Sequence, residues 1–232
     1  MTVNAYLNAG VIMKNFPGKL LPVGCDNDVV NSLLFAQLAV SKDHSAPSSF
    51  VERETQIQAW LDSLFWIVSR VGDDEINDTA AFDVLSVATK ECEKKFDPAV
   101  VTQFVELFSE LRTVIPTAKA LSLWQDRVVV KSNKPLDGPD ECSKVEQSDV
   151  CVKFAVLGAG PVFYTLTVSF VTPTVLGSNF LSQNIVADVN GGVAIEAKSY
   201  VLNEHGYIKV RKEISEKVKD KKKNFLMPWG AI

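Results

Sequence analysis

Two histidines are the residues of this chain best suited to acid–base chemistry near neutral pH. His44 stands in the Ser- and Pro-rich stretch HSAPSS (44–49), and His205 stands beside Gly206. Neither belongs to an HExxH motif, a GxSxG arrangement or a Cys/His pattern. We expect both to be ordinary loop residues, and we find no catalytic constellation.

The other candidate sites are equally weak. The four cysteines, Cys25, Cys92, Cys142 and Cys151, lack CxxC or metal-site spacing, so we expect scattered buried thiols. The stretch GAGP (158–161) lacks the spacing of a phosphate loop and reads as a hairpin turn. The acidic residues of 73–78 lack the alternation and closing Glu of a calcium loop. The sequence therefore predicts no catalytic residue, no metal and no cofactor, and a protein that is not an enzyme.

Charge is distributed unevenly along the chain. The net charge is −4, which gives no general basis for nucleic-acid binding. Residues 25–115 hold 16 acidic and 7 basic residues, whereas 209–232 hold 8 basic and 3 acidic ones. The basic segment is either a solvated helix or a contact for an anionic surface. With no run of about 18 apolar residues and no signal-like start, we expect a soluble protein.

The first half of the chain has helical periodicity. Apolar spacing predicts helices over 29–40 and 50–72, the second ending at Gly72. A third helix is expected after Asn77 or Asp78. The pair Asp97-Pro98 predicts the start of a fourth helix that runs to about Ile115.

The second half has β-type patterns that begin near Leu121. The two long runs at 151–160 and 161–177 are apolar on both faces, so they need helices on both sides. This predicts an α+β fold: a single three-layer α/β/α domain whose antiparallel sheet is wrapped by amphipathic helix pairs. The expected strands are 121–132, which extends from a helical turn, 150–158, 162–171, 184–189, 193–202 and a short one at 207–210 before a charged helix.

Three segments resemble one known family. They are AVVTQFVELFSELRTVIPTAKALSLWQDRVVVKS (99–132), SDVCVKFAVLGAGPVFYTLTVSFVTPTV (148–175) and NIVADVNGGVAIEAKSYVLNEHGYIKV (184–210). Their order, a helix leading into a strand and then long aromatic-rich strands, is similar to that of the Cyt-type cytolysins of bacteria and the volvatoxin-like cytolysins of fungi. By this resemblance, 1–24 is an N-terminal extension and 211–232 a basic C-terminal extension, both candidates for removal. The Cyt-like domain is then 25–210, with a helical layer (27–116) and a core sheet (121–210).

The resemblance implies a pore-forming cytolysin. A soluble monomer would bind a lipid membrane, detach its helix layers and insert or oligomerise through its long strands. The implied partners are lipid and further copies of the chain, with no nucleic acid and no small-molecule substrate. Release by a non-classical route and action on a target-cell membrane are expected. The alternatives are a non-lytic lipid-binding virulence or host-interaction protein of the same fold, and an enzyme of unrecognised type.

Two sets of residues are expected to contact the membrane. The strand set is Val152, Phe154, Val156, Phe163, Tyr164, Leu166, Val168, Phe170, Val193 and Ile195. The second set is expected on an amphipathic helix at the membrane interface and consists of Trp60, Leu64, Phe65 and Trp66.

Overall fold

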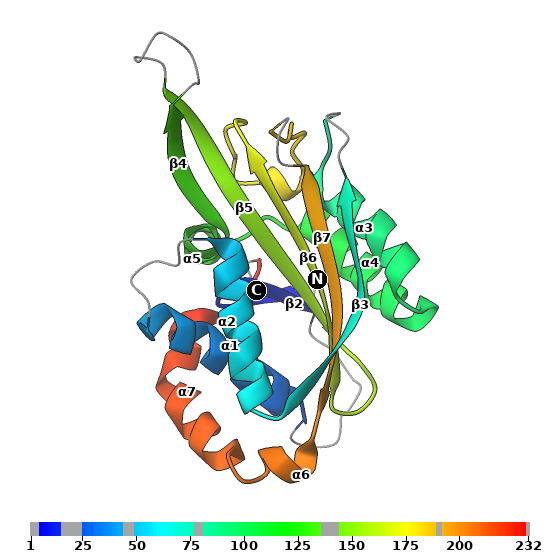
Figure 1. The fold of residues 1–232 in the computed structure, drawn as a ribbon, viewed down its shortest axis with the longest axis vertical. Helices are drawn as coiled ribbons and strands as arrows, with labels where there is room; N and C mark the ends of the chain where they lie inside the picture. The colour runs from blue at the N-terminus through cyan, green and yellow to red at the C-terminus, as the bar shows by residue number, and fades with distance from the viewer. Residues whose placement is uncertain are drawn as a thin grey trace.

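A single mixed sheet lies between two layers of helices in the computed structural model (Figure 1). The structure describes residues 5–14, 25–43, 49–76, 81–135, 144–188 and 192–230. His44, Asn77, Asp78 and Cys142 lie outside these ranges. The predicted α+β class and three-layer arrangement are confirmed.

The sheet follows the order β3-β7-β6-β5-β2-β1-β8, and β4 pairs with β5. Its long central strands β5, β6 and β7 pair antiparallel, as predicted. One pair departs from the antiparallel pattern, because β2 runs parallel to β5. The strands are β1 (Ala5–Asn8), β2 (Val11–Lys14), β3 (Trp66–Ile76), β4 (Val129–Pro135), β5 (Lys144–Leu157), β6 (Val162–Thr172), β7 (Val193–Leu202) and β8 (Leu226–Pro228).

The helices start where side-chain caps are available. Ser49, Asp83, Asp97 and Thr117 each accept a hydrogen bond from a backbone N–H in the first turn of the helix that follows. The helices are α1 (Cys25–Asp43), α2 (Phe50–Ser63), α3 (Val84–Lys95), α4 (Pro98–Thr113), α5 (Ala118–Val128), the 3-10 turn η1 (Phe180–Ser182), α6 (Glu204–Tyr207) and α7 (Arg211–Phe225).

Two hydrophobic cores fill the spaces between the layers. The larger core packs α3, α4, α5 and η1 against one face of β5, β6 and β7. The smaller core packs α1 and α2, with Ile214 of α7, against the opposite face near the lower ends of these strands. No helix of the described residues covers the upper part of that second face, toward β4 in Figure 1.

The prediction of one helix over 50–72 is wrong. The helix α2 ends at Ser63, and Phe65 adopts a left-handed backbone conformation (φ 65°) that turns the chain into β3. From Trp66 on, exposure alternates: Trp66 is 1% exposed and Ile67 is 60% exposed. Gly72 lies at a register shift inside β3 rather than at a helix end. The run Phe65–Val68 is thus a strand start whose bulky residues also satisfy a helical stripe.

Smaller corrections concern element ends. Asp83 caps α3, so the helix starts later than predicted. Most of 121–132 belongs to α5, and β4 has 7 residues. Within 184–188 the chain makes a single β-bridge, Ile185 to Phe82, and no strand. In the segment 207–210, Tyr207 ends α6 and 208–210 form a turn before α7, so the expected strand is absent there.

The two terminal segments contribute to the sheet and to its helical cover. β1 pairs with β2 and with β8, and β2 pairs with β5. Trp229 is 2% exposed and packs edge-on against Trp124, with 5.1 Å between ring centroids. Arg211 on α7 binds the buried carboxylate of Asp28 on α1. Removal of 1–24 or 211–232 therefore requires these contacts to break.

Candidate functional site

Nine of the ten strand residues expected at a membrane share one face of the sheet. They lie in or against the larger core, beneath α3 and α4. Phe163 is the exception. It points to the opposite face, where its ring stacks on Tyr200 at 4.4 Å and meets Trp66 edge-on at 4.9 Å. The structure thus gathers the predicted residues into one continuous apolar surface.

The opposite face of the same strands is polar over its upper part, which corrects the expectation of strands apolar on both faces. In β6, Thr165, Thr167 and Ser169 alternate with Leu166, Val168 and Phe170. In β7, Glu196 and Lys198 alternate with Val193, Ile195 and Ala197. Because Thr and Ser are only weakly polar, the run 161–177 was interpreted as apolar on both faces. The sequence YTLTVSF (164–170) nevertheless alternates with period 2, which places Thr and Ser together on one face. These polar residues were missing from the sequence prediction.

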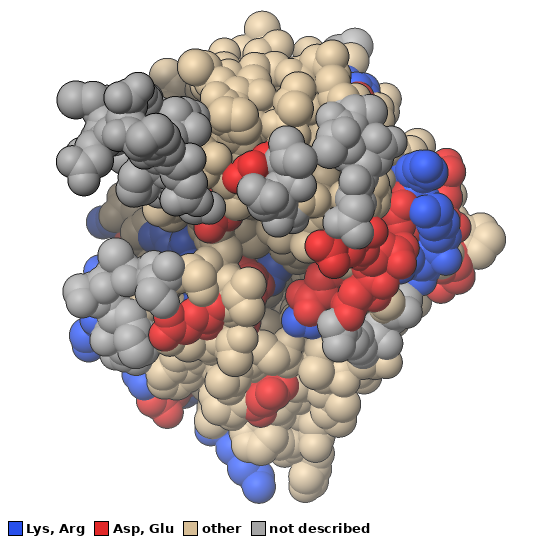
Figure 2. Space-filling model, turned by 45° about the horizontal axis from the view of Figure 1, so that its top comes forward, with Lys and Arg blue, Asp and Glu red and all other residues tan. Residues whose placement is uncertain are grey.

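An acidic groove lies over this polar face. It has a volume of about 680 Å³ and is bordered by the first turns of α2 and by β3, β5, β6 and β7. Figure 2 shows acidic side chains gathered beside this hollow. Lys198 pairs with Glu196 inside the groove at 2.8 Å. The charged and hydroxyl side chains in its lining are Glu54, Asp73, Asp74, Glu75, Asp149, Glu196, Lys198, Ser49, Thr55, Thr167 and Ser169.

Lysine–carboxylate pairs tie three of the cover helices, α2, α3 and α4, to the sheet. Lys14 of β2 pairs with Glu106 of α4, and Lys95 of α3 pairs with Asp74 of β3 at 2.8 Å. Lys153 of β5 pairs with Glu54 of α2, and its side chain is 8% exposed. Burial acts to lower the pKa of Lys153, but the Glu54 carboxylate, together with Tyr200 and Cys151, outweighs burial and the pKa is raised. The ammonium group therefore stays charged inside the protein.

The aromatic helix predicted at the membrane interface is divided between three elements. Trp60 lies on α2, half-buried, and meets Phe35 of α1 edge-on at 5.5 Å. Leu64 is the C-cap of α2 and is 5% exposed. Phe65 forms the turn, and Trp66 begins β3 in the smaller core. Phe65 and Trp66 are thus not helical, because the chain has already left α2.

The remaining candidate groups show no nucleophile or metal site in the ranges that the structure describes. Burial raises the pKa of Cys92 to about 12, and burial also raises the pKa of Cys151, so both thiols stay protonated at neutral pH. His205 is exposed on α6. No cluster of three or more His, Cys, Asp or Glu side chains suited to a metal occurs among the described residues. Within the same residues, no helix is long and apolar enough to span a membrane.

Comparison with known proteins finds likeness in solved structures and none in sequence. No protein-family model and no curated protein matches the sequence. A solved structure titled delta-endotoxin is 6% identical with a TM-score of 0.46, covering 84% of this chain and 81% of that one. Activated Cyt2Ba monomer from Bacillus thuringiensis subsp. israelensis is 11% identical with a TM-score of 0.42, covering 84% of this chain and 98% of that one. At these identities the likeness concerns the fold alone.

Proposed function

We propose that the protein is a membrane-active, pore-forming cytolysin. The observation that carries the proposal is the alternation along β5, β6 and β7, with one apolar face and an opposite face that is polar over its upper part. Strands that cross a membrane alternate in this way, with apolar side chains toward lipid and polar ones toward water. Their lengths of 14, 11 and 10 residues meet the roughly 9–11 residues that a tilted spanning strand needs.

The cover of the apolar face supports a helix-detachment step. The helices α3 and α4 form one consecutive segment that packs on this face. If this segment swings away, Val152, Leu166 and Ile195 become available to lipid without any change in the pairing of their strands. The lower ends of the strands also lie under α1 and α2, so both layers have to move for a full crossing.

Oligomerisation follows from the backbone. An inserted sheet with open edges leaves unpaired N–H and C=O groups in lipid, where each costs several kcal/mol. The edges have to close on other copies of the chain, so the active species is an assembly rather than a monomer.

A non-lytic lipid-binding role is the second candidate, and one surface favours it. Ile208 is 63% exposed before α7, beside three basic residues, Arg211, Lys212 and Lys219, and one acidic residue, Glu216. An exposed apolar side chain among basic ones suits the surface of an anionic membrane. Binding there requires no strand to leave the fold.

The test is dye release from liposomes of several lipid compositions, before and after limited proteolysis, with vesicle flotation on the same samples. Release accompanied by oligomers supports the cytolysin. Flotation of folded protein without release supports the lipid-binding role. If no lipid composition gives either dye release or flotation, both the cytolysin and the lipid-binding role are contradicted.

A further inference from the structure

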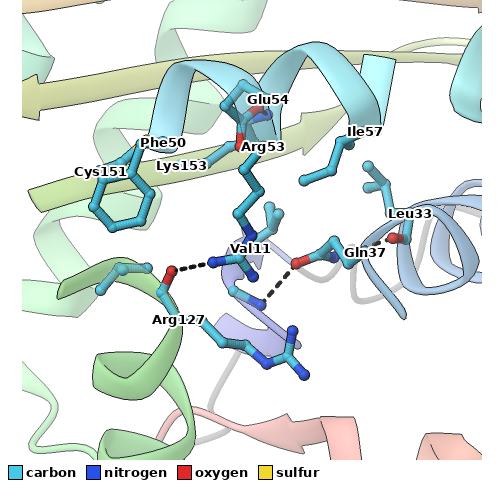
Figure 3. Close-up of a pocket in the computed structure, with 12 residues that line it drawn as sticks. Val11, Leu33, Gln37, Phe50, Arg53, Glu54, Ile57, Arg127, Cys151 and Lys153 are labelled. Carbon is cyan, nitrogen blue, oxygen red and sulfur yellow. Dashed lines mark hydrogen bonds and ion pairs between the residues drawn. The ribbon is translucent and has the colours of Figure 1, made fainter. Parts of the chain in front are cut away.

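A small cavity lies where α1, α2, α5 and the β1–β2 turn meet (Figure 3). It encloses about 20 Å³ and is partly open to solvent. A space of this size holds about one or two water-sized oxygen atoms. Its polar lining consists of Gln37, Arg53, Glu54, Arg127, Cys151 and Lys153.

The cavity is cationic in an otherwise acidic chain. Three of its side chains are positive and one, Glu54, is negative, whereas the whole chain has a net charge of −4. Glu54 is bound by Lys153. Among the residues that the structure describes, no carboxylate forms an ion pair with Arg53 or with Arg127. Two guanidinium groups therefore line the cavity without an ion-pair partner among the described residues, although the carboxylates of Glu54 and Asp126 partly offset their charge.

Most donors of these two groups are unused within the described chain. Arg53 donates one hydrogen bond, from an Nη atom to the Arg127 carbonyl oxygen at 2.7 Å. Arg127 donates one to the Ser41 hydroxyl at 3.4 Å and stacks over the Phe225 ring at 5.0 Å. A guanidinium offers about five N–H donors. The Gln37 amide is already engaged with Gly10 and with two carbonyls, so the arginines are the groups left to bind a ligand.

The pKa values of both guanidinium groups are lowered. Burial lowers the pKa of Arg127 to about 10, and the neighbouring Arg53 lowers it further in the same direction. Burial also lowers the pKa of Arg53. Two half-buried cations repel each other at low dielectric, and an anion between them removes this repulsion.

We propose that Arg53 and Arg127 bind a phosphate group at the mouth of this cavity. Planar guanidinium groups match phosphate oxygens with paired hydrogen bonds, and two such groups suit one phosphate. The enclosed space accepts one or two of its oxygens, and the partly open side leaves room for whatever the phosphate is attached to. The source is either a phosphomonoester lipid headgroup or free phosphate. The site does not depend on the lytic activity proposed above.

Thermal unfolding of the full chain in inorganic phosphate tests the site. Relative to sodium chloride at equal ionic strength, about 20 mM phosphate should raise the Tm of the wild type by about 3 °C. Arg127→Gln should lose this increment. Arg112→Gln removes an arginine that pairs with Asp83 and does not line the cavity, and this variant should keep the increment. An equal increment in wild type and Arg127→Gln would place the binding elsewhere and overturn the proposal.

A second arm identifies the source. Flotation with phosphatidylcholine vesicles, with and without phosphatidic acid, is compared for wild type, Arg127→Gln and Arg127→Lys. Binding that needs phosphatidic acid and Arg127 assigns the site to a headgroup, and an effect of inorganic phosphate alone assigns it to the free ion. Arg127→Lys keeps the charge and the folded state but loses paired hydrogen bonds, so its affinity should fall about tenfold. If neither probe distinguishes wild type from these variants, the site does not exist.

Discussion

Glu54→Gln is the substitution whose effect follows most directly from the structure. It removes the carboxylate that pairs with Lys153, an ammonium that stands on β5 beneath α2 with a side chain 8% exposed. Breaking a buried pair by removing one partner costs about 3–5 kcal/mol, because the other charge is left uncompensated. Glu54 itself is 20% exposed at the edge of the groove, so water reaches the site and the lower value, about 3 kcal/mol, applies.

For a chain of this size, that loss corresponds to a Tm lower by about 6–12 °C. Urea denaturation at pH 7 measures the free energy of unfolding, with Glu213→Gln as the matched control. Glu213 pairs with Lys217 along the exposed face of α7 at 2.6 Å, so its loss should cost less than about 0.5 kcal/mol. The double variant Glu54→Gln/Lys153→Met removes both charges and should recover most of the stability.

The same pair holds α2 on the sheet, so Glu54→Gln should also speed dye release from liposomes if helix detachment limits lysis. The reasoning about the pair is refuted if Glu54→Gln destabilises the protein no more than Glu213→Gln does. It is also refuted if the double variant is less stable than the single one.

Three further predictions concern the sheet and its cover. Val168→Asp places a charge in the larger core, where Val168 is fully buried, and should prevent folding. The control Val201→Asp changes a position that is 43% exposed and should fold. Circular dichroism distinguishes the two outcomes. Burial raises the pKa of Tyr200 and of Tyr207 to about 12, whereas an unfolded Tyr titrates near 10, so the unfolded state loses its proton first. Stability should thus be intact below about pH 10 and fall by up to about 2–3 kcal/mol per Tyr as the pH rises from 10 to 12; equal urea midpoints at pH 9 and 11.5 would contradict this. A cysteine pair introduced where α4 crosses β5, with Cα atoms within about 7 Å, should block dye release when oxidised and restore it when reduced; full release from the oxidised protein would exclude detachment of α4.

The sequence predicts elements well where one local signal decides the structure. Asp97-Pro98 is such a signal, and Asp97 accepts hydrogen bonds from the backbone N–H groups of both Ala99 and Val100. The hairpin at 158–161 is another: Gly160 has a φ of 79°, which suits glycine, and β5 and β6 pair on either side of it. The nine core-facing strand residues were predictable because period 2 fixes which side chains share a face.

Prediction fails where distant contacts decide. Phe65, just after α2, has a positive φ, which is unusual for a bulky residue. Its ring packs so closely on Gly206 that a Cβ atom at position 206 would lie 2.4 Å from the ring. No local pattern signals that arrangement. β1 and β8 have 4 and 3 residues, too few for any periodicity. The two cavity arginines are 74 positions apart in sequence, so only the fold brings them together.

The pairing of β1 with β8 has a consequence for folding kinetics. Leu7 lies opposite Met227, so this edge of the sheet joins residues from nearly opposite ends of the described chain. The strands β5 and β6, by contrast, are joined by a short turn and can pair early. Contacts between distant segments form slowly, because a large loop must close before they yield any stabilisation. The time that the chain needs to become fully native is therefore set by the meeting of its ends rather than by its long central hairpin.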